Sequence, residues 1–114
     1  MIDDVFCKII KGELSQDGII YQDDDFIVKK DIHPQAPIHM VIFPKKHIFG
    51  MHDATPEVFG QAMTIADKVA QQLGIADKGY RLILNEGEDG GKLVPHFHIH
   101  LLGGKNLGPK IVKD

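Results

Sequence analysis

The stretch that decides the fold is PHFHIHLL, residues 95–102, which places histidines at positions 96, 98 and 100. Side chains of a β-strand alternate between the two faces of a sheet, so the three imidazoles share one face. The residues between them are apolar and share the other face, which needs a packing partner such as a helix. The pattern predicts a strand over residues 96–102 that presents three imidazoles to a ligand.

The rest of the chain predicts an α+β fold with an antiparallel sheet. A short helix is expected after an Asp3 cap and is ended by Gly12, and a long helix is expected over residues 56–73, with Thr55 as its N-cap. Apolar residues recur at helical spacing in the long helix and predict core or a subunit interface: Phe59, Ala62, Met63, Ala66, Val69, Ala70 and Leu73. Further strands are expected at residues 19–22, 26–30, 38–43 and 80–85.

Composition narrows the class of protein. The chain has 114 residues, a net charge of −3 and one cysteine, which fits one domain over residues 1–114 without an internal disulfide. No basic patch marks it as a nucleic-acid binder. The N-terminus lacks a signal-peptide pattern and no apolar run approaches a membrane span, so we expect no membrane partner and a cytoplasmic location. A domain this small leaves much surface exposed, which makes pairing with a second copy plausible.

The histidine face suits either a metal or a nucleophile. Three histidines and water make a catalytic zinc site, but His96 and His100 would lie about 13 Å apart along an extended strand. No obvious Cys, Asp or Glu stands beside them, so we expect neither a metal nor another cofactor. A neutral imidazole is a competent nucleophile near pH 7, and the middle histidine, His98, has support on either side.

Neighbouring segments add candidate residues. The Gly90-Gly91 pair could form a nest of backbone N–H groups for an anion or be a plain connecting loop. Asp31 could hold ribose hydroxyls or cap a turn, and Asn85 offers both a donor and an acceptor. His39 is a possible fourth imidazole of the site. The loop histidines at positions 33, 47 and 52 are expected to be solvated.

Together these segments resemble the histidine triad (HIT) family. The resemblance rests on the triad, on Asn85-Glu86-Gly87 and on HPQAP at residues 33–37. Leu102-Gly103-Gly104 and PKKH at residues 44–47 are most similar to the Hint branch. The family resemblance covers a core of about residues 5–104, and residues 105–114 form a tail after it. The resemblance implies a five-stranded antiparallel sheet with one short and one long helix, assembled as a homodimer.

The resemblance also implies an activity, which is hydrolysis of purine nucleoside 5′-phosphoramidates of the AMP or GMP type. His98 matches the nucleophile that forms a nucleotidyl-histidine intermediate, and His100 matches the phosphate contact. His96 and His39 match supporting imidazoles. The remaining matches are nucleotide contacts: Asp31 to the ribose, Ile32 beside the base, and Asn85, Gly91, Lys92 and Leu93 on the phosphate side.

Two departures from the Hint pattern affect specificity. Leu93 stands where a hydroxyl residue is usual near the leaving group, and leucine donates no hydrogen bond, so an imidazole or Lys92 would have to supply the proton. Lys29 and Lys30 stand where an aromatic or apolar base contact is usual, so the base preference does not carry over. Two other functions stay open: a dinucleoside polyphosphate hydrolase like the Fhit branch, and a regulatory nucleotide-binding protein with little turnover.

Overall fold

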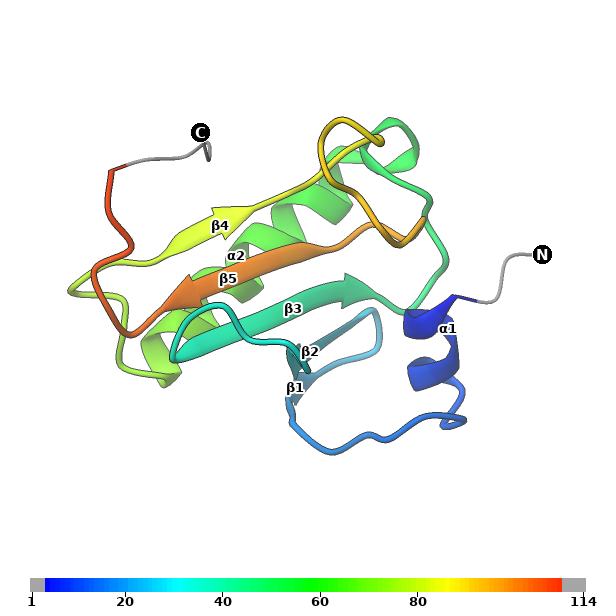
Figure 1. Cartoon of the computed structure of the whole chain (residues 1–114). Coiled ribbons are helices and arrows are strands. Elements are labelled where there is room, and N and C mark those ends of the chain that lie inside the picture. The colour runs from blue at the N-terminus through cyan, green and yellow to red at the C-terminus, as the bar shows by residue number, and fades with distance from the viewer. Residues whose placement is uncertain (1–3, 110–114) are drawn as a thin grey trace.

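The computed structural model describes residues 4–109. They form a five-stranded antiparallel sheet and two α-helices (Figure 1), which confirms the predicted fold class. Across the sheet the strands run in the order β1-β2-β3-β5-β4. In chain order the elements are α1 (Val5–Ile10), β1 (Ile19–Gln22), β2 (Phe26–Lys30), β3 (Ile38–Pro44), a 3₁₀ helix (Met51–Asp53), α2 (Pro56–Gln72), β4 (Arg81–Ile83) and β5 (Ile99–Gly103).

Helix α2 begins as the sequence predicts. The Thr55 hydroxyl accepts a hydrogen bond from the Val58 N–H at 3.3 Å, which satisfies one of the free N–H groups of the first turn. The helix ends at Gln72, one residue before the predicted end. Its buried residues are Ala62, Ile65, Ala66, Val69 and Ala70. Met63, which was expected in the apolar stripe, is 45% exposed, so it is not core within this chain.

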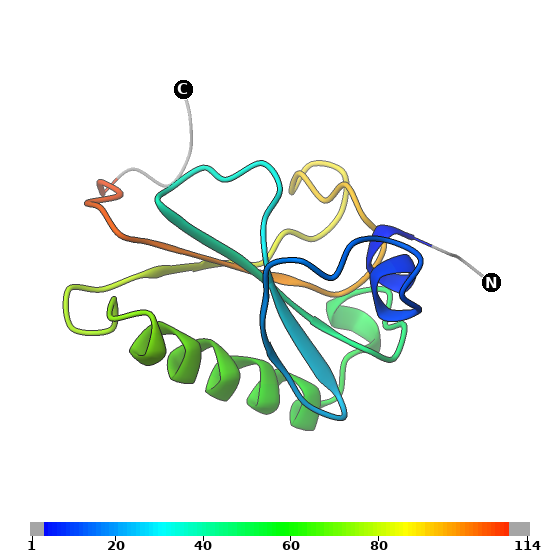
Figure 2. The same ribbon diagram turned by 90° about the horizontal axis from the view of Figure 1, so that it is seen from below.

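The sheet separates two apolar clusters. Figure 2 shows α2 along one face of the sheet, with the loops that follow β2 and β4 on the opposite side. Phe97, Ile99 and Leu101 are buried in the cluster that includes α2, as the alternation of the histidine stretch predicts. The opposite face carries a smaller cluster: Phe6, Ile9, Ile27, Val41 and Phe43. The helix thus covers the apolar face of the histidine stretch and leaves the imidazole face open.

Helix α1 packs its Phe6 on the open face of the sheet. The Phe6 and Phe43 rings stack with centroids 4.5 Å apart. The N-cap of this helix is Asp4, and not Asp3 as expected: Asp4 Oδ1 accepts a hydrogen bond from Cys7 N at 2.8 Å. Asp3 itself lies outside the described residues. This one-residue shift also brings the Asp4 carboxylate to the histidines.

Two strands are shorter than predicted. Strand β5 begins at Ile99 and not at His96, because the Phe97 N–H donates to the Ile48 carbonyl at 2.6 Å and so follows the loop before α2. Strand β4 spans residues 81–83 and not 80–85. Its Ile83 pairs with His100, so residue 84 would face Ile99, the first residue of β5, and residue 85 has no strand residue opposite it.

Candidate active site

The register of the central strands brings together two imidazoles that are far apart in the sequence. Val41 lies opposite His100 and His39 lies opposite Leu102, so all four side chains point to the same face of the sheet. His39 Nε2 lies 2.9 Å from His100 Nδ1. The fourth imidazole predicted from the sequence therefore does contact the triad.

A backbone N–H group fixes the tautomer of His39. The Gln35 N–H donates to His39 Nδ1 at 3.0 Å, so a neutral His39 carries its proton on Nε2. That proton faces His100 Nδ1 and, at 3.3 Å, Asp31 Oδ2. When His39 donates this proton in a hydrogen bond to His100 Nδ1, that nitrogen is the acceptor. A neutral His100 therefore carries its own proton on Nε2. The arrangement makes His100 Nε2 a hydrogen-bond donor.

The central histidine is held by its own backbone. The Nδ1–H of His98 donates to the His96 carbonyl oxygen at 2.6 Å. A neutral His98 then has an unprotonated Nε2 with a free lone pair. The rings of His98 and His100 lie edge to face with centroids 5.1 Å apart. His98 therefore presents a nucleophilic nitrogen next to a donor imidazole.

The first histidine of the triad has a different environment. His96 is fully buried, and its Nε2–H donates to the Pro44 carbonyl at 2.9 Å. Its ring packs edge-on against Phe6, with centroids 5.5 Å apart. His96 thus supports the site from beneath, through its packing and through the carbonyl that holds His98.

A second polar cluster surrounds Nδ1 of His96. Asp4 Oδ2 lies 3.2 Å from this nitrogen and 3.3 Å from His47 Nδ1, while Cys7 Sγ lies 3.2 Å from His47 Nδ1. The four ligand atoms lie within 4.8 Å of one another, and carboxylate, thiolate and imidazole are all zinc ligands. The expectations that no Asp or Cys stands beside the triad and that His47 is merely solvated were therefore wrong. Asp31, His39 and His100 form a second group with similar spacing.

Burial keeps the triad neutral near pH 7. It lowers the pKa of His98 below 6.5, although the hydrogen bond to the His96 carbonyl opposes the shift. It also lowers the pKa of His96. Burial and the neighbouring His98 and His39 rings lower the pKa of His100 to about 4, against the opposing charge of Asp31. A neutral His98 is the form that a nucleophile requires.

A cavity of about 620 Å³ opens on this face of the sheet. Among the residues predicted to form the site, those that line it are Asp31, Ile32, His39, Asn85, Gly91, Leu93, His98 and His100. Its wall also includes residues that sequence reasoning did not assign to the site: Val5, Phe6, Ile9, Leu14 and Lys29. The i, i+3 spacing of Phe6 and Ile9 could have indicated that α1 forms part of this wall. His96 and Lys92 are not among the lining residues.

The loop between β4 and β5 is closed by its own hydrogen bonds. The Gly91 N–H donates to the Glu88 carbonyl at 2.9 Å and the Lys92 N–H donates to the Gly87 carbonyl at 3.1 Å. These two N–H groups are not free to form an anion nest, so for them the plain connecting loop is the correct interpretation. The Lys92 ammonium donates to Glu86 and to the Phe49 carbonyl. It therefore ties the loop to the segment before α2.

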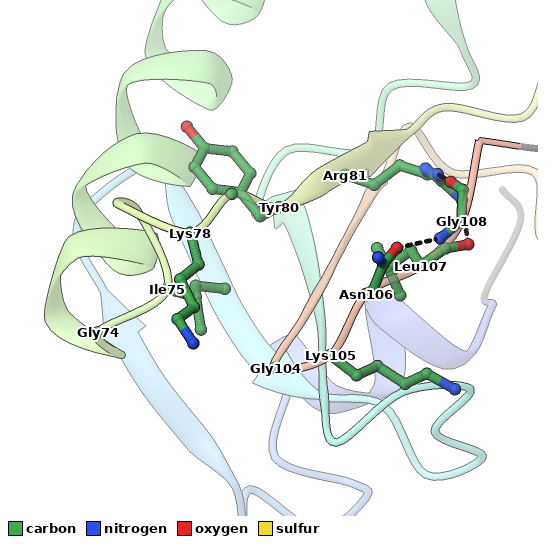
Figure 3. A pocket seen from close by; sticks show the side chains of 11 residues that line it. Gly74, Ile75, Lys78, Tyr80, Arg81, Gly104, Lys105, Asn106, Leu107 and Gly108 are labelled. Atoms are coloured by element: carbon green, nitrogen blue, oxygen red, sulfur yellow. Dashed lines mark hydrogen bonds between the residues drawn. The ribbon is translucent and has the colours of Figure 1, made fainter.

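Another cavity, of about 700 Å³, lies beyond the other end of β5. Figure 3 shows Ile75, Lys78 and Lys105 at its wall. Arg81 also lines it, but its guanidinium donates to the Leu107 and Gly108 carbonyls. No histidine is among the lining residues, so this cavity lacks the nucleophile and the proton donor found at the triad.

The fold and the site define a small α+β protein with a cluster of imidazoles in an open cavity on one face of the sheet. A sequence profile described as the HIT domain matches residues 13–107, and the chain belongs to this family, which confirms the resemblance seen in the sequence. The purine nucleoside phosphoramidase of Escherichia coli K12 is 46% identical over 110 residues, 94% of this chain and 92% of that protein.

Solved structures agree with this assignment. A HIT family hydrolase from Clostridium thermocellum superposes with a TM-score of 0.92 at 47% identity, covering 98% of this chain and 99% of that one. A HIT family hydrolase from Legionella pneumophila gives a TM-score of 0.87 at 39% identity, covering 92% and 96%. Across residues 4–109, no helix is both long enough and apolar enough to span a membrane.

Proposed function

We propose that this protein is a hydrolase that cleaves the P–N bond of purine nucleoside 5′-phosphoramidates through a nucleotidyl-histidine intermediate. The observation that carries the proposal is the hydrogen bond from His98 Nδ1 to the His96 carbonyl, at 2.6 Å, because it leaves Nε2 free to attack phosphorus. The similarity to a protein named purine nucleoside phosphoramidase supports this substrate class.

In the first step the Nε2 lone pair of His98 attacks phosphorus, and the P–N bond breaks with its electron pair going to the leaving nitrogen. The anionic phosphate raises the pKa of the adjacent His100, which takes a second proton from solvent on Nδ1, the nitrogen 3.7 Å from Asp31 Oδ2, and donates its Nε2 proton to the leaving nitrogen. The His39 Nε2–H, which faced His100 Nδ1, then donates to Asp31 Oδ2 at 3.3 Å. The amine leaves, and His98 carries the nucleotide as a cationic imidazolium. Its Nδ1–H then makes a charge-assisted hydrogen bond to the His96 carbonyl, which stabilises this charge.

In the second step water attacks the phosphorus of the intermediate. Neutral His100 takes the proton from the water, and the bond between phosphorus and His98 Nε2 breaks with its electron pair returning to the ring. The products are a nucleoside 5′-monophosphate and the enzyme with His100 protonated, and His100 returns its extra proton to solvent when the nucleotide leaves. His100 thus acts as acid in one step and base in the other.

Residues of the cavity wall would position the nucleotide. Asp31 lies beside His39 and is placed to accept hydrogen bonds from ribose hydroxyls, and Ile32, 76% exposed at the rim, would pack on the base. Asn85 and Gly91 border the phosphate side. Leu93, 92% exposed, offers the leaving group no donor, so His100 takes that role. Lys92 does not line the cavity, and Glu86 and Phe49 accept two of its three ammonium donors, so it would act on the phosphate mainly through its charge.

The test is mass spectrometry of rapidly quenched reactions with adenosine and guanosine 5′-phosphoramidates. We expect a nucleotide adduct on a peptide that contains His98 in the wild type. The adduct should be absent in His98→Ala, and turnover should fall at least about a hundredfold. An adduct on another residue, or full turnover by His98→Ala, would refute the proposal. Faster turnover of diadenosine polyphosphates would favour the Fhit-like activity, and AMP binding without turnover would favour a regulatory role.

We also propose that two copies form a homodimer, with the cytoplasmic location predicted from the sequence. Strand β4 is at one edge of the sheet, where its outer hydrogen-bonding groups face no other strand of the described chain. Met63 on α2 is exposed. Pairing of unpaired strand edges is a common route to association. Light scattering during size-exclusion chromatography should give the mass of two chains, and the mass of one chain at micromolar concentration would contradict the proposal.

A further inference from the structure

A buried lysine lines the nucleotide cavity without a partner. Lys29 is 8% exposed on β2. Its ammonium has no hydrogen bond or ion pair with another residue of the described range 4–109, whereas the Lys92 ammonium is bound to Glu86. The only buried side-chain nitrogen or oxygen in that range with no partner and no solvent contact is His47 Nε2. The Lys29 ammonium therefore reaches open space, and the space it borders is the cavity.

The sheet register places Lys29 at the opposite end of the cavity from the catalytic imidazoles. Lys29 lies opposite Val41 on β3, and Val41 lies opposite His100 on β5. Two strand spacings separate the backbones of Lys29 and His100, which is about 10 Å. Asp31, the proposed ribose ligand, follows β2 directly. Lys29 is thus on the far side of the ribose position from the phosphate, where a base would lie.

The wall around Lys29 suits a flat ring. The wall of the cavity that Lys29 lines also contains apolar side chains of α1 and the segment after it: Val5, Phe6, Ile9 and Leu14. Such a wall stabilises a base through burial of its faces but offers no hydrogen bond to its edge. Two lysines line the cavity, Lys29 and Lys30, and Lys29 is the buried one, so its ammonium is the cationic group that the wall holds in place for that edge.

The chemistry of an ammonium selects among bases. Lysine has three donors and no acceptor, and a buried donor is costly to leave without a partner. Guanine and hypoxanthine present two acceptors, O6 and N7, on one edge, whereas adenine presents N7 beside an N6 amino donor that faces the lysine unfavourably. We propose that Lys29 is a specificity-determining residue that selects 6-oxopurine nucleotides over adenine nucleotides. This inference rests on the proposed function, because it places the base within the same cavity.

The experiment compares kcat/KM for guanosine, inosine and adenosine 5′-phosphoramidates. We expect the wild type to favour the two oxopurines by about 10-fold to 100-fold, the range of one well-placed donor to an O6/N7 edge. In Lys29→Met, which removes the charge but keeps an apolar stem, the preference should disappear. Lys29→Arg, which keeps the donors, should retain it. Lys46→Met removes an exposed loop charge and should leave the preference unchanged.

Equal kcat/KM for the three substrates in the wild type would overturn the inference while leaving the phosphoramidase proposal intact. An oxopurine preference that persists in Lys29→Met would also overturn the inference and leave the phosphoramidase proposal intact. Calorimetric binding of GMP, IMP and AMP separates the two proposals. If no phosphoramidate is hydrolysed, tighter binding of GMP and IMP that depends on Lys29 still supports the specificity role, and binding without this dependence overturns it. Urea denaturation establishes that Lys29→Met is folded.

Discussion

Acid should destabilise the folded protein through His100. Burial and the neighbouring imidazoles lower the pKa of His100 to about 4 in the folded state, against 6.5 in an unfolded chain. The unfolded chain therefore binds this proton more tightly than the folded chain does. The stability associated with a neutral His100 is fully present above about pH 6.5, and it is lost as the pH falls from about 6.5 towards about 4.

The size of the effect follows from the two pKa values. Between pH 7 and pH 5, proton linkage at one such site lowers the free energy of unfolding by about 2 kcal/mol. The His100 side chain is only 20% exposed, so solvent screening removes little of this. Because the pKa values of His96 and His98 are also lowered, the useful quantity is the difference between the wild type and His100→Gln.

The assay is urea denaturation of wild type and His100→Gln at pH 7 and at pH 5. We expect the wild type to lose about 2 kcal/mol more than the variant over this range, because glutamine does not titrate. His52→Gln, a change at an exposed histidine, serves as the control and should lose as much as the wild type. If His100→Gln loses as much stability as the wild type, the assignment of a buried, neutral His100 is wrong.

Three further substitutions test other parts of the structure. His39→Phe removes the donor 2.9 Å from His100 Nδ1, so kcat for phosphoramidates should fall about 10-fold to 100-fold while the adduct stays on His98; an unchanged kcat would exclude a positioning role for His39. Gly90→Ala places a Cβ 2.2 Å from the Glu86 carbonyl, which should lower the free energy of unfolding by about 1–3 kcal/mol. A Cβ added at Gly60 on α2 has no atom within 4 Å, so Gly60→Ala should raise the free energy of unfolding by about 0.5–1 kcal/mol. Equal effects of Gly90→Ala and Gly60→Ala in urea denaturation would contradict this account.

Local rules predicted much of the fold. The bounds of β1 and β2 agree with the prediction, and α2 starts at Pro56 after a Thr55 cap, because caps and short-range periodicity act within a few residues. The alternation of the histidine stretch also assigned its two faces correctly. The prediction was wrong where residues distant in the sequence form hydrogen bonds. The Phe97 N–H donates to the Ile48 carbonyl, 49 positions earlier, so β5 begins at Ile99 and not at His96.

The candidate site shows the same limit. His98 and His39 were predicted from residue type and position, and the cavity contains both. The contacts of His47 were missed, because its partners Asp4 and His96 are 43 and 49 positions away. Lys29 was noticed only as a departure from an apolar base contact. Its burial in the cavity wall depends on segments that are distant from it in the sequence, and the residues next to Lys29 do not reveal them.

One row of the sheet connects catalysis with specificity. Lys29, Val41 and His100 lie opposite one another on β2, β3 and β5, so the spacing between the proposed base donor and the proposed phosphate donor is fixed by backbone pairing and not by flexible loops. A shift of β2 by one residue would turn Lys29 to the α2 side and bring an apolar neighbour to the cavity. The buried Ile27, on the same face as Lys29, packs in the α1 cluster and opposes such a shift. The core packing that stabilises β2 therefore also keeps the Lys29 side chain in the cavity wall, where we propose that the base binds.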